Sequence, residues 1–500
     1  SQLVEGLDNI FRMPYGCFEQ TSSTTYPNIL ALDYLQRTKQ SAPKIEAKAR
    51  QYIHLGYQRL VSFEVAGGGF DWFGRPPANC TLTAYGLMEF EDMARVHDVD
   101  PQLIARTRRW LLNQRQSDGS WAAEGYTPHH APARGGDARL AATAYIAQAV
   151  FAGGKLEDNP TPTRDFLLRH APDSIRDPHV LALVGNALLA LDPQGESAAP
   201  YLDRLESLKQ TGEDGKLVWW RQPDGARTTF YGAGRSGEIE TTALAALALL
   251  HGKRHLGTAR GALAWLIAQK DARGTWHSTQ ATVLTLKALL AATDKGAGDG
   301  ERRVLVRLGD KLQREIVIPV DQAEVLKQLD LSPFLRAGRQ RLQLTETTAT
   351  GAGYQVTLRY HVPEAKTDKA EPLTVQLDYD RTELRIDETV KATAKVVNNR
   401  PEKSAMVMLD LPLPAGFIVD ASDFTALVQS GRIARFQVLD HNVLVYLREL
   451  EARKPLELTY HLRATMAVKV NAPGARAYEY YDPDRAGRSV GARFTVTAAR

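Results

Sequence analysis

The sequence is poor in cysteine and has no large excess of charge of either sign. It contains two cysteines, Cys17 and Cys80, and no residues at metal-ligand spacing accompany them. Its 62 basic and 58 acidic side chains leave a formal charge of +4, so nucleic-acid binding has no electrostatic support. No apolar run reaches the length of a membrane span. What remains is a chain of ordinary apolar content, long enough for about two to four globular domains.

The first cysteine lies in the run Pro14–Gln20, with the sequence PYGCFEQ. Gln20 follows Cys17 by three residues, so the two side chains meet if a helix begins here. Attack of the Cys17 thiolate on the amide carbon of Gln20, with loss of ammonia, would leave an internal thioester. Such a bond is a stored electrophile that survives only where water is excluded. Two other interpretations stay open for Cys17: a buried thiol, which is also the interpretation favoured for Cys80, or a disulfide between the two.

The first 295 residues are helical in pattern. Alanine- and leucine-rich amphipathic stretches recur at Ile29–Gln36, Lys44–Phe63, Leu82–Val96, Arg139–Phe151, Val180–Leu191, Thr241–Leu250 and Ser278–Ala291. Short loops that end in an aromatic residue precede many of them, at Gly68–Phe70, Asp118–Trp121, Leu217–Trp220 and Gly274–Trp276. A loop followed by a buried helix, repeated every few dozen residues, indicates a helical array. We expect apolar inner helices wrapped by more polar outer ones in a closed α/α toroid.

The pattern changes after Gly296–Gly300, a small and turn-prone stretch. Strands are predicted at Val304–Leu308, Glu315–Ile318, Arg341–Leu344 and Gln355–Val362, which make a small β module over 296–365. A charged linker follows at 366–372. From 373 to 500, strands with turns between them predict an antiparallel sandwich, at Leu373–Tyr379, Glu388–Asn398, Ala405–Leu411, Arg432–Val438, Asn442–Leu447, Leu456–Arg463 and Arg493–Thr497.

The run Pro14–Gln20 resembles the thioester motif of the α2-macroglobulin and complement family, whose signature is Pro-x-Gly-Cys-x-Glu-Gln. Gly56–Leu60, Gly68–Phe70, Trp72–Gly74 and Leu82–Tyr85 fit the family too. Phe18 stands where the animal motif has glycine, a departure that bacterial members of the family can show. The resemblance implies a C-terminal fragment: a toroidal thioester domain (1–295), the C-terminal part of a CUB-like β domain (296–365) and a macroglobulin-like, receptor-binding-type sandwich (373–500).

The resemblance also assigns roles at the motif. Cys17 supplies the thioester sulfur and Gln20 the acyl carbon, while Pro14 and Gly16 shape the turn into the helix. A helix N-terminus would favour the thiolate through its dipole and its free N–H groups. Glu19 has two open interpretations, a group that assists proton transfer and a structural hydrogen-bonding group.

Further residues are candidates for acyl transfer or for shielding. In hydroxyl-preferring complement proteins a histidine attacks the thioester first; His129, or its neighbour His130, occupies the corresponding loop, with two solvated histidines as the alternative. Tyr480 and Tyr481, in the predicted aromatic loop Tyr478–Pro483, are candidates to cap the bond, or else lie at an exposed strand–loop junction.

Three residues near the motif are candidates to keep the thioester dry. Tyr15, Phe18 and Trp72 are large aromatic side chains that would exclude water if they packed around the bond. Ordinary packing in a hydrophobic core is the alternative for each of them.

The function implied by the resemblance is covalent capture of an attacking protease. A cut in a bait segment elsewhere exposes the thioester, which acylates a lysine or hydroxyl group of the protease in a single turnover, so the chain is not an enzyme and needs no cofactor or metal. The chain opens at Ser1 in a helical pattern, which suggests a piece of a larger protein. The bacterial form of the motif implies a periplasmic protein, with an inner-membrane lipid anchor and partnership with cell-wall synthesis enzymes as further expectations.

Two other functions stay open. Gln116–Trp121 resembles the repeat motif of α/α-toroid enzymes such as terpenoid cyclases and prenyltransferases, although no acidic motif or zinc triad is evident. Alternatively, the thioester never forms and the sandwich binds a partner without covalent chemistry. Uptake of methylamine distinguishes covalent capture through a thioester from both of these alternatives.

Overall fold

A computed structural model describes residues 14, 16–37, 43–123, 138–152, 158–193, 196–213, 215–271, 275–293, 301–310, 312–319, 329–348, 356, 358 and 371–498. The chain divides into two compact units. The first comprises Ser1–Thr229 and Gly237–His361, and the second comprises Phe230–Ser236 and Val362–Arg500. Each unit is described separately below.

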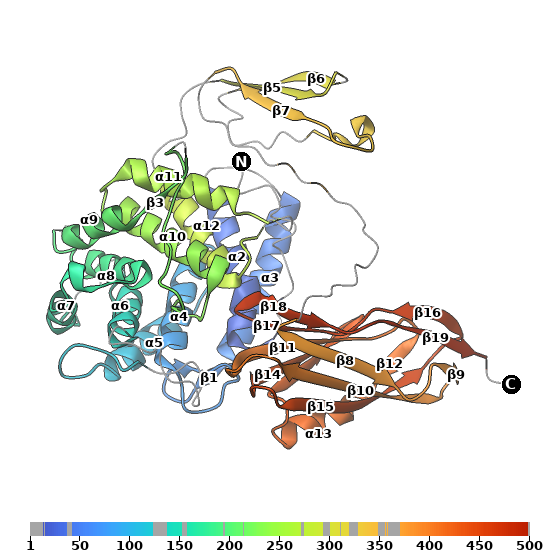
Figure 1. Ribbon diagram of the computed structural model, residues 1–500. Coiled ribbons are helices and arrows are strands. Elements are labelled where there is room, and N and C mark those ends of the chain that lie inside the picture. Colours follow the sequence, from blue (N-terminus) through green and yellow to red (C-terminus); the bar gives the residue numbers. More distant parts are fainter. Residues whose placement is uncertain are drawn as a thin grey trace. The chain divides into compact units, whose positions relative to one another are not determined.

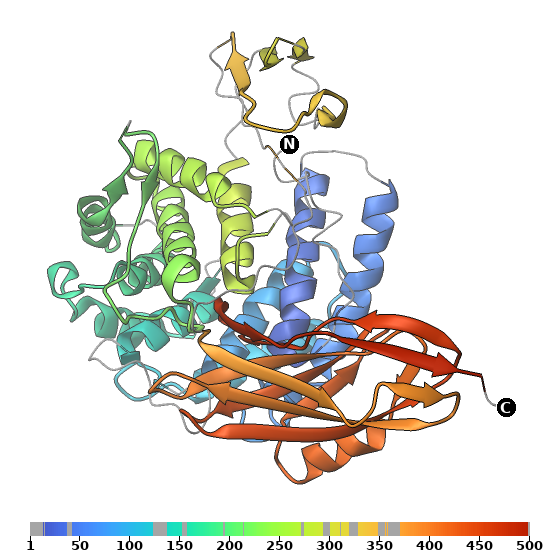
Figure 2. The same ribbon diagram turned by 45° about the vertical axis from the view of Figure 1, so that its right-hand side comes forward.

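The first unit is built mainly from helices that alternate between an inner and an outer position (Figures 1 and 2). The inner helices are α2 (Phe18–Arg37), α4 (Cys80–Met93), α6 (Ala138–Phe151), α8 (Pro178–Leu191), α10 (Gly234–His251) and α12 (Thr279–Thr293). The outer helices are α3 (Pro43–Val61), α5 (Pro101–Asn113), α7 (Thr161–Leu168), α9 (Ala199–Leu208) and α11 (Leu256–Ala268). Short hairpins join some of them: β1 (Glu64–Val65) with β2 (Gly69–Phe70), and β3 (Gln210–Thr211) with β4 (Val218–Trp219).

The inner helices close into a ring. Helix α2 packs against α4, α4 against α6, α6 against α8, and α12 returns to α2. The side chain of Asn186 on α8 donates to the carbonyl of Leu244 on α10, at 3.1 Å. The hydroxyl of Ser278, just before α12, donates to Glu240 on α10 at 3.1 Å. The predicted α/α toroid is therefore confirmed, and the inner helices are buried almost all round because neighbours cover every face.

In three of the repeats, a tryptophan in the loop between an outer helix and the next inner helix makes hydrogen bonds to both helices. Its indole N–H donates to a carbonyl in the last turn of the preceding outer helix, where carbonyls lack helical partners. Its backbone N–H donates to a threonine hydroxyl of the following inner helix. The three sets are Trp121 with Leu111 and Thr143, Trp220 with Leu205 and Thr242, and Trp276 with Leu266 and Thr282. This repeated contact explains why three of the four predicted loops end in tryptophan.

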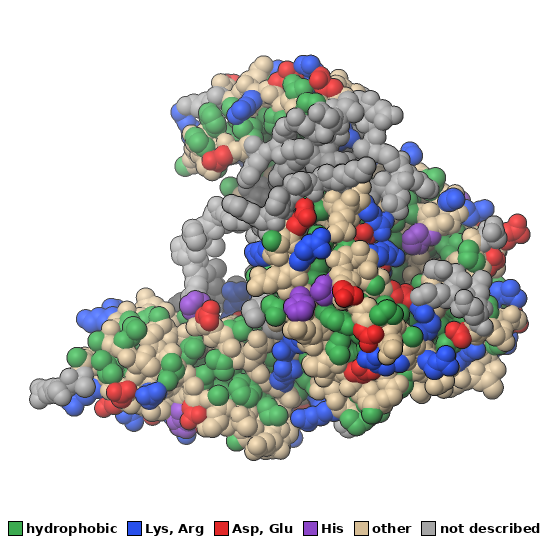
Figure 3. Space-filling model, turned by 180° about the vertical axis from the view of Figure 1, so that it is seen from behind, with side chains coloured by type: hydrophobic (Ala, Val, Ile, Leu, Met, Phe, Trp, Pro, Cys, Tyr) green, Lys and Arg blue, Asp and Glu red, His purple; other side chains and the backbone are tan. Residues whose placement is uncertain are grey.

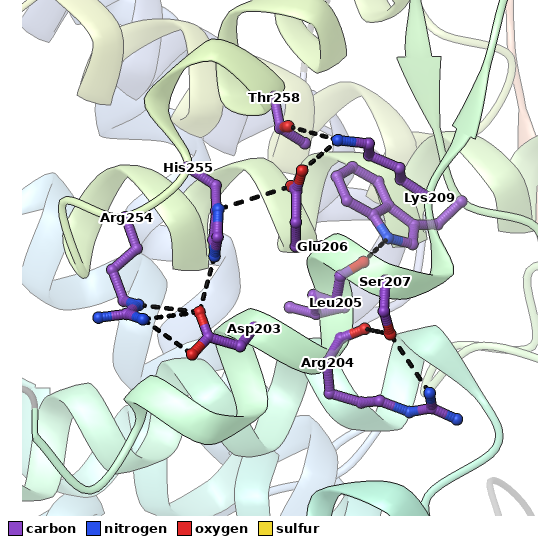
Figure 4. A network of polar contacts seen from close by, with 10 residues as sticks. Asp203, Arg204, Leu205, Glu206, Ser207, Lys209, Arg254, His255 and Thr258 are labelled. Carbon is purple, nitrogen blue, oxygen red and sulfur yellow. Dashed lines mark hydrogen bonds and ion pairs between the residues drawn. The ribbon is translucent and has the colours of Figure 1, made fainter.

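Polar contacts link neighbouring outer helices as well. Figure 4 shows Asp203 on α9 accepting from the Arg254 guanidinium at 2.7 Å and contacting Nε2 of His255 at 2.7 Å. Hydrogen bonds from Arg254 and His255 lower the pKa of Asp203. Lys209, just after α9, donates to the hydroxyl of Thr258 on α11 at 3.2 Å. These contacts fix α9 against the start of α11.

The β module within the first unit is a three-stranded antiparallel sheet of order β6-β5-β7. Its strands are β5 (Arg302–Leu308), β6 (Leu312–Ile318) and β7 (Leu342–Glu346). The further strand predicted at Gln355–Val362 lies outside the described residues, apart from residues 356 and 358. The CUB-like nature of this module and the domain boundaries stay predictions.

The second unit is a sandwich of mainly antiparallel sheets (Figure 2). Its strands are β8 (Leu373–Tyr379), β9 (Glu383–Arg385), β10 (Thr389–Asn398), β11 (Ser404–Pro412), β12 (Phe417–Val419), β13 (Arg435–Val438), β14 (Asn442–Leu450), β15 (Pro455–Ala464), β16 (Val468–Ala472), β17 (Arg476–Glu479), β18 (Asp482–Arg488) and β19 (Ala492–Thr497). The sheet orders are β12-β15-β10-β8, β13-β14-β11-β17-β18 and β16-β19-β9, in which only the β19–β9 pair is parallel. The predicted sandwich is confirmed.

Burial alternates along the central strands of this sandwich, as expected for strands with one face on a core. In β10, for example, Val390, Ala392, Ala394 and Val396 are fully buried, and the residues between them are more exposed. One helix, α13 (Ala421–Gln429), packs Phe424 into the same core. Asp420 caps that helix by accepting from the backbone of Ser422.

Candidate thioester site

Cys17 and Gln20 lie at the N-terminus of α2, the first inner helix. Cys17 is the N-cap residue, since its carbonyl accepts from the backbone N–H of Thr21 at 2.9 Å. The side chain of Gln20 folds back, and its Oε1 accepts from the backbone N–H of Cys17 at 3.0 Å. This is half of a capping box, in which the third helical residue reaches back to the N-cap. The contact brings the carboxamide of Gln20 to the residue that carries the thiol.

Gly16 makes room for this arrangement. Its φ is +85°, a left-handed conformation that favours glycine. A Cβ on residue 16 would lie 2.1 Å from Oε1 of Gln20 and 3.0 Å from its Cδ. Glycine is therefore the residue that allows both the turn and the close approach of the Gln20 amide.

The pair is shielded from solvent. Cys17 is 0% exposed and Gln20 is 2% exposed, a burial that would protect a thioester from water. Phe18 is fully buried, with its ring centroid 5.1 Å from that of Phe70 and 6.2 Å from that of Phe63. Its backbone N–H donates to the carbonyl of Trp72 at 2.9 Å. Phe18 and Trp72 thus both adjoin the motif, whereas Tyr15 lies outside the described residues.

Glu19 is fully buried in the interior of the first unit. Burial raises the pKa of its carboxyl well above the usual value; a hydrogen bond with the Trp72 side chain opposes this rise, and Glu240 adds to it. Two other carboxyl groups share the interior. Burial raises the pKa of Glu89, on α4, to about 8, and that of Glu240, on α10, to about 7. A neutral Glu19 would not oppose formation of a thiolate nearby.

One contact at the motif could not be anticipated from sequence spacing. Arg59, on the outer helix α3, donates to the carbonyl of Gly16 at 2.7 Å and to the hydroxyl of Thr21 at 3.2 Å. Its guanidinium also lies 5.8 Å from the ring centroid of Phe63. Arg59 is 43 residues from Gly16 in sequence. The only sequence signal was its place in Gly56–Leu60, a segment that fits the family pattern.

The remaining candidates divide between the two units. Cys80 is buried at the start of α4, and no disulfide joins it to Cys17, so that rival interpretation is wrong for this structure. His129 and His130 lie outside the described residues.

The aromatic run Tyr478–Pro483, in the second unit, is not the loop that the sequence suggested. Its first residues belong to β17 and its last to β18, with Tyr480 and Tyr481 in the turn between them. Tyr481 is 6% exposed, so it is not at an exposed junction. Its ring lies 5.0 Å from that of Tyr480 and 6.1 Å from that of Tyr231, in the segment Phe230–Ser236 of the same unit.

Three further observations bear on the class of protein. Within the described residues, no helix combines the length and the apolar content that crossing a membrane requires. The same residues include no group of three or more His, Cys, Asp or Glu arranged to hold a metal ion. On the face shown in Figure 3, basic and acidic side chains are interspersed, in keeping with the balanced charge of the sequence.

The fold and the site define a protein that combines an α/α toroid, with a buried cysteine–glutamine pair at an inner helix, and a β-sandwich. Comparison with known families agrees. Residues 1–291 match the A-macroglobulin TED domain, and residues 402–490 match the A-macroglobulin receptor binding domain. The chain belongs to the α-macroglobulin family.

Individual relatives are longer than this chain. Ovostatin from Gallus gallus is 26% identical over 502 residues, which cover 96% of this chain and 33% of that protein. The fold is similar to that of a Salmonella α2-macroglobulin reacted with methylamine, with a TM-score of 0.69 and 19% identity over 99% of this chain and 31% of that one. An Escherichia coli α2-macroglobulin spanning domain MG7 to the C-terminus gives a TM-score of 0.67 and 16% identity, over 99% and 75% of the two chains. The chain thus spans about a third of the length of the full-size relatives.

Proposed function

We propose that this chain is the acylating part of an α2-macroglobulin-type protease inhibitor, which captures an attacking protease through a thioester between Cys17 and Gln20. The observation that carries the proposal is the hydrogen bond from the Cys17 backbone to Oε1 of Gln20, inside a fully buried helix start. Membership of the α-macroglobulin family supports a role as an inhibitor. The role is single-turnover, since each thioester reacts once.

The chemistry needs only the side chains at hand. In closure, the Cys17 thiolate attacks Cδ of Gln20, and ammonia leaves with the proton that the thiol gave up. In capture, a lysine amine of the protease attacks the same carbon, the C–S bond breaks, and the proton lost by the amine returns to the sulfur. The product is an isopeptide bond to residue 20 and a free Cys17 thiol. A hydroxyl target would give an ester by the same route, and His129 or His130 remains the candidate base for it.

The structure supports an energetic preference for this route. A helix N-terminus stabilises a negative charge by about 0.3–1 kcal/mol, and more where it is partly buried. The Cys17 side chain starts at such a terminus, so both attack by its thiolate and its departure are favoured. Tyr480 and Tyr481 remain candidates to shield the bond in the intact protein. A periplasmic location, a lipid anchor and cell-wall synthesis enzymes as partners are further parts of the proposal.

The test of capture uses a protease that carries accessible lysines. We expect a covalent conjugate that resists denaturant and whose cross-linked peptide joins residue 20 to a lysine of the protease. Cys17→Ala should abolish the conjugate, and Cys80→Ala, which removes the other buried cysteine, should not. A conjugate that persists in Cys17→Ala would contradict the proposal. The proposal would also be contradicted if the wild-type protein formed the thioester but transferred its acyl group to no amine.

A further inference from the structure

Arg59 and Gln20 hold the same peptide unit from opposite sides. The carbonyl oxygen of the Gly16–Cys17 peptide accepts from Nη2 of Arg59 at 2.7 Å and from its Nε at 3.3 Å. The N–H of that peptide donates to Oε1 of Gln20 at 3.0 Å. Because a peptide unit is planar and trans, its C=O and N–H point in opposite directions. The guanidinium, the peptide and the Gln20 carbonyl therefore form one hydrogen-bonded chain.

This series of hydrogen bonds ends at Oε1 of Gln20, which is the oxygen that becomes negatively charged during the reaction. Attack on Cδ of Gln20, by Cys17 in closure or by an amine in capture, moves the carbonyl π electrons onto Oε1. The tetrahedral intermediate carries its negative charge there until the leaving group departs. A backbone N–H about 2.7–3.1 Å from that position is the usual geometry of an oxyanion-stabilising donor. The 3.0 Å contact from Cys17 places this donor on the same oxygen before the reaction begins.

The position of Arg59 supports an electrostatic effect on this donor. Its guanidinium keeps its positive charge at all ordinary pH values. Hydrogen bonds in a chain polarise one another, so a cation on the carbonyl makes the N–H of the same peptide a stronger donor. Arg59 is half-buried, and its third contact, with the hydroxyl of buried Thr21, fixes its position on the first turn of α2.

We propose that the backbone N–H of Cys17 is the oxyanion-stabilising donor of the thioester reaction, and that Arg59 is the positioning residue that orients and polarises it. This inference rests on the proposed function, because it assigns parts to the same reaction. It predicts that both closure of the bond and its opening by amines depend on the guanidinium. Arg59 touches neither the sulfur nor the acyl carbon in this role and acts through the Gly16–Cys17 peptide.

The experiment measures the rate at which methylamine opens the thioester in Arg59→Met and Arg59→Lys, by intact mass and thiol release. Loss of polarisation should slow opening, by roughly tenfold in Arg59→Met, and Arg59→Lys should recover part of the rate because it keeps the charge. A merely structural role predicts the opposite sign, since a loosened turn admits water and amine and speeds opening. Arg50→Met is the matched control, because Arg50 lies on the same helix and donates to the carbonyl of Val96, away from the motif.

Each outcome decides between the possibilities. Slower opening in Arg59→Met with an unchanged Arg50→Met rate supports the inference. So does a folded Arg59→Met protein that fails to close the bond while Arg59→Lys closes it, because closure passes through the same oxyanion. Faster or unchanged opening in Arg59→Met would overturn the inference and leave the proposed function standing. Wild-type protein that takes up no methylamine would overturn both.

Discussion

A Cβ on Gly16 would lie 2.1 Å from the side-chain oxygen of Gln20, so residue 16 and the Gln20 carboxamide compete for one small space. We expect Gly16→Ala to displace the carboxamide from the Cys17 backbone N–H and to prevent formation of the thioester. The mass of the purified variant, with a count of its thiols, measures this. Gly215→Ala is the control, because Gly215 also has a positive φ, +68°, but has open space around its Cβ position. A Gly16→Ala protein with a complete thioester would show that the close approach is not required.

Phe18 and Gly86 form a second close pair. A Cβ on Gly86 would lie 2.8 Å from Cζ of Phe18, so the absence of a side chain on α4 accommodates the buried ring. We expect Phe18→Ala to lower the free energy of unfolding by about 3–5 kcal/mol, as is usual for loss of a buried aromatic side chain. Because the ring also covers the motif, hydrolysis of the thioester should accelerate.

A double-mutant cycle checks whether Phe18 and Gly86 contribute to stability through their mutual contact. Gly86→Ala alone should be destabilising, and combination with Phe18→Leu should recover part of the loss. Denaturant unfolding of the four proteins measures the coupling. Strict additivity of the two substitutions would mean that Phe18 and Gly86 do not share this space.

A partly buried ion pair joins two of the inner helices that close the toroid. Nζ of Lys287 on α12 lies 2.9 Å from Oδ2 of Asp92 on α4, and the hydroxyl of Tyr26 on α2 donates to the same oxygen at 2.6 Å. Burial alone would raise the pKa of Asp92, but Lys287, Tyr26 and Arg95 together lower it below its usual value. Asp92 therefore stays ionised among three helices.

Removal of Lys287 alone should lower the free energy of unfolding more than removal of both Lys287 and Asp92. We expect Lys287→Met to destabilise the first unit by less than the roughly 3–5 kcal/mol of a fully buried pair, because Lys287 is 27% exposed and Arg95 still contacts the buried Asp92 carboxylate. Lys287→Met combined with Asp92→Leu should be less destabilised than Lys287→Met alone. Thermal and denaturant unfolding provide the comparison, and a double variant no more stable than the single one would contradict this account.

The buried carboxyl groups predict a pH dependence of stability. The pKa of Glu89 rises on folding from an ordinary value of 4.5 to about 8 because the group is buried. The folded state therefore holds the proton more tightly than the unfolded state. Stability is greatest below pH 4.5 for this group and falls between there and about pH 8, by at most about 1.4 kcal/mol per pH unit.

Substitution isolates this contribution. Glu89→Gln should flatten the pH dependence of the unfolding free energy and raise stability at alkaline pH relative to wild type. Glu196→Gln makes the same chemical change at an exposed position and should leave the pH dependence unaltered. Denaturant unfolding at several pH values measures both. Identical slopes for wild type and Glu89→Gln would mean that Glu89 is not buried as described.

Much of the fold could be predicted from local sequence because the inner helices are apolar all round and follow aromatic loops. Outer helices were expected, but the sequence did not place α5, α7, α9 and α11. In α5, α7 and α9 only a few residues are buried, so their apolar stripes are narrow. In the second unit, β17 and β18 were read as a loop because Tyr480 and Tyr481 interrupt the alternation at a tight turn. Short strands such as β9 and β12 carry too few residues for a period-two pattern.

The site also combines residues that local sequence could predict with residues that it could not. Cys17, Gln20 and Gly16 lie within five residues of one another, so one helix start brings them together. Arg59 contacts the motif from another helix, and Glu240 acts on it only through its effect on the pKa of Glu19; no local spacing relates either residue to the motif. One usable signal was an acidic residue next to a long apolar run, as with Glu240 in α10, because a buried carboxyl needs specific partners.

The central claim is that Cys17 and Gln20 store an acyl group. The most direct measurement is the intact mass of freshly purified protein before and after methylamine, with a thiol count at each step and Cys17→Ala as the comparison. The account predicts a mass short by one ammonia that rises by one methylamine as a single new thiol appears, and neither change in Cys17→Ala. A full unmodified mass, with both thiols present and no methylamine uptake, would contradict it.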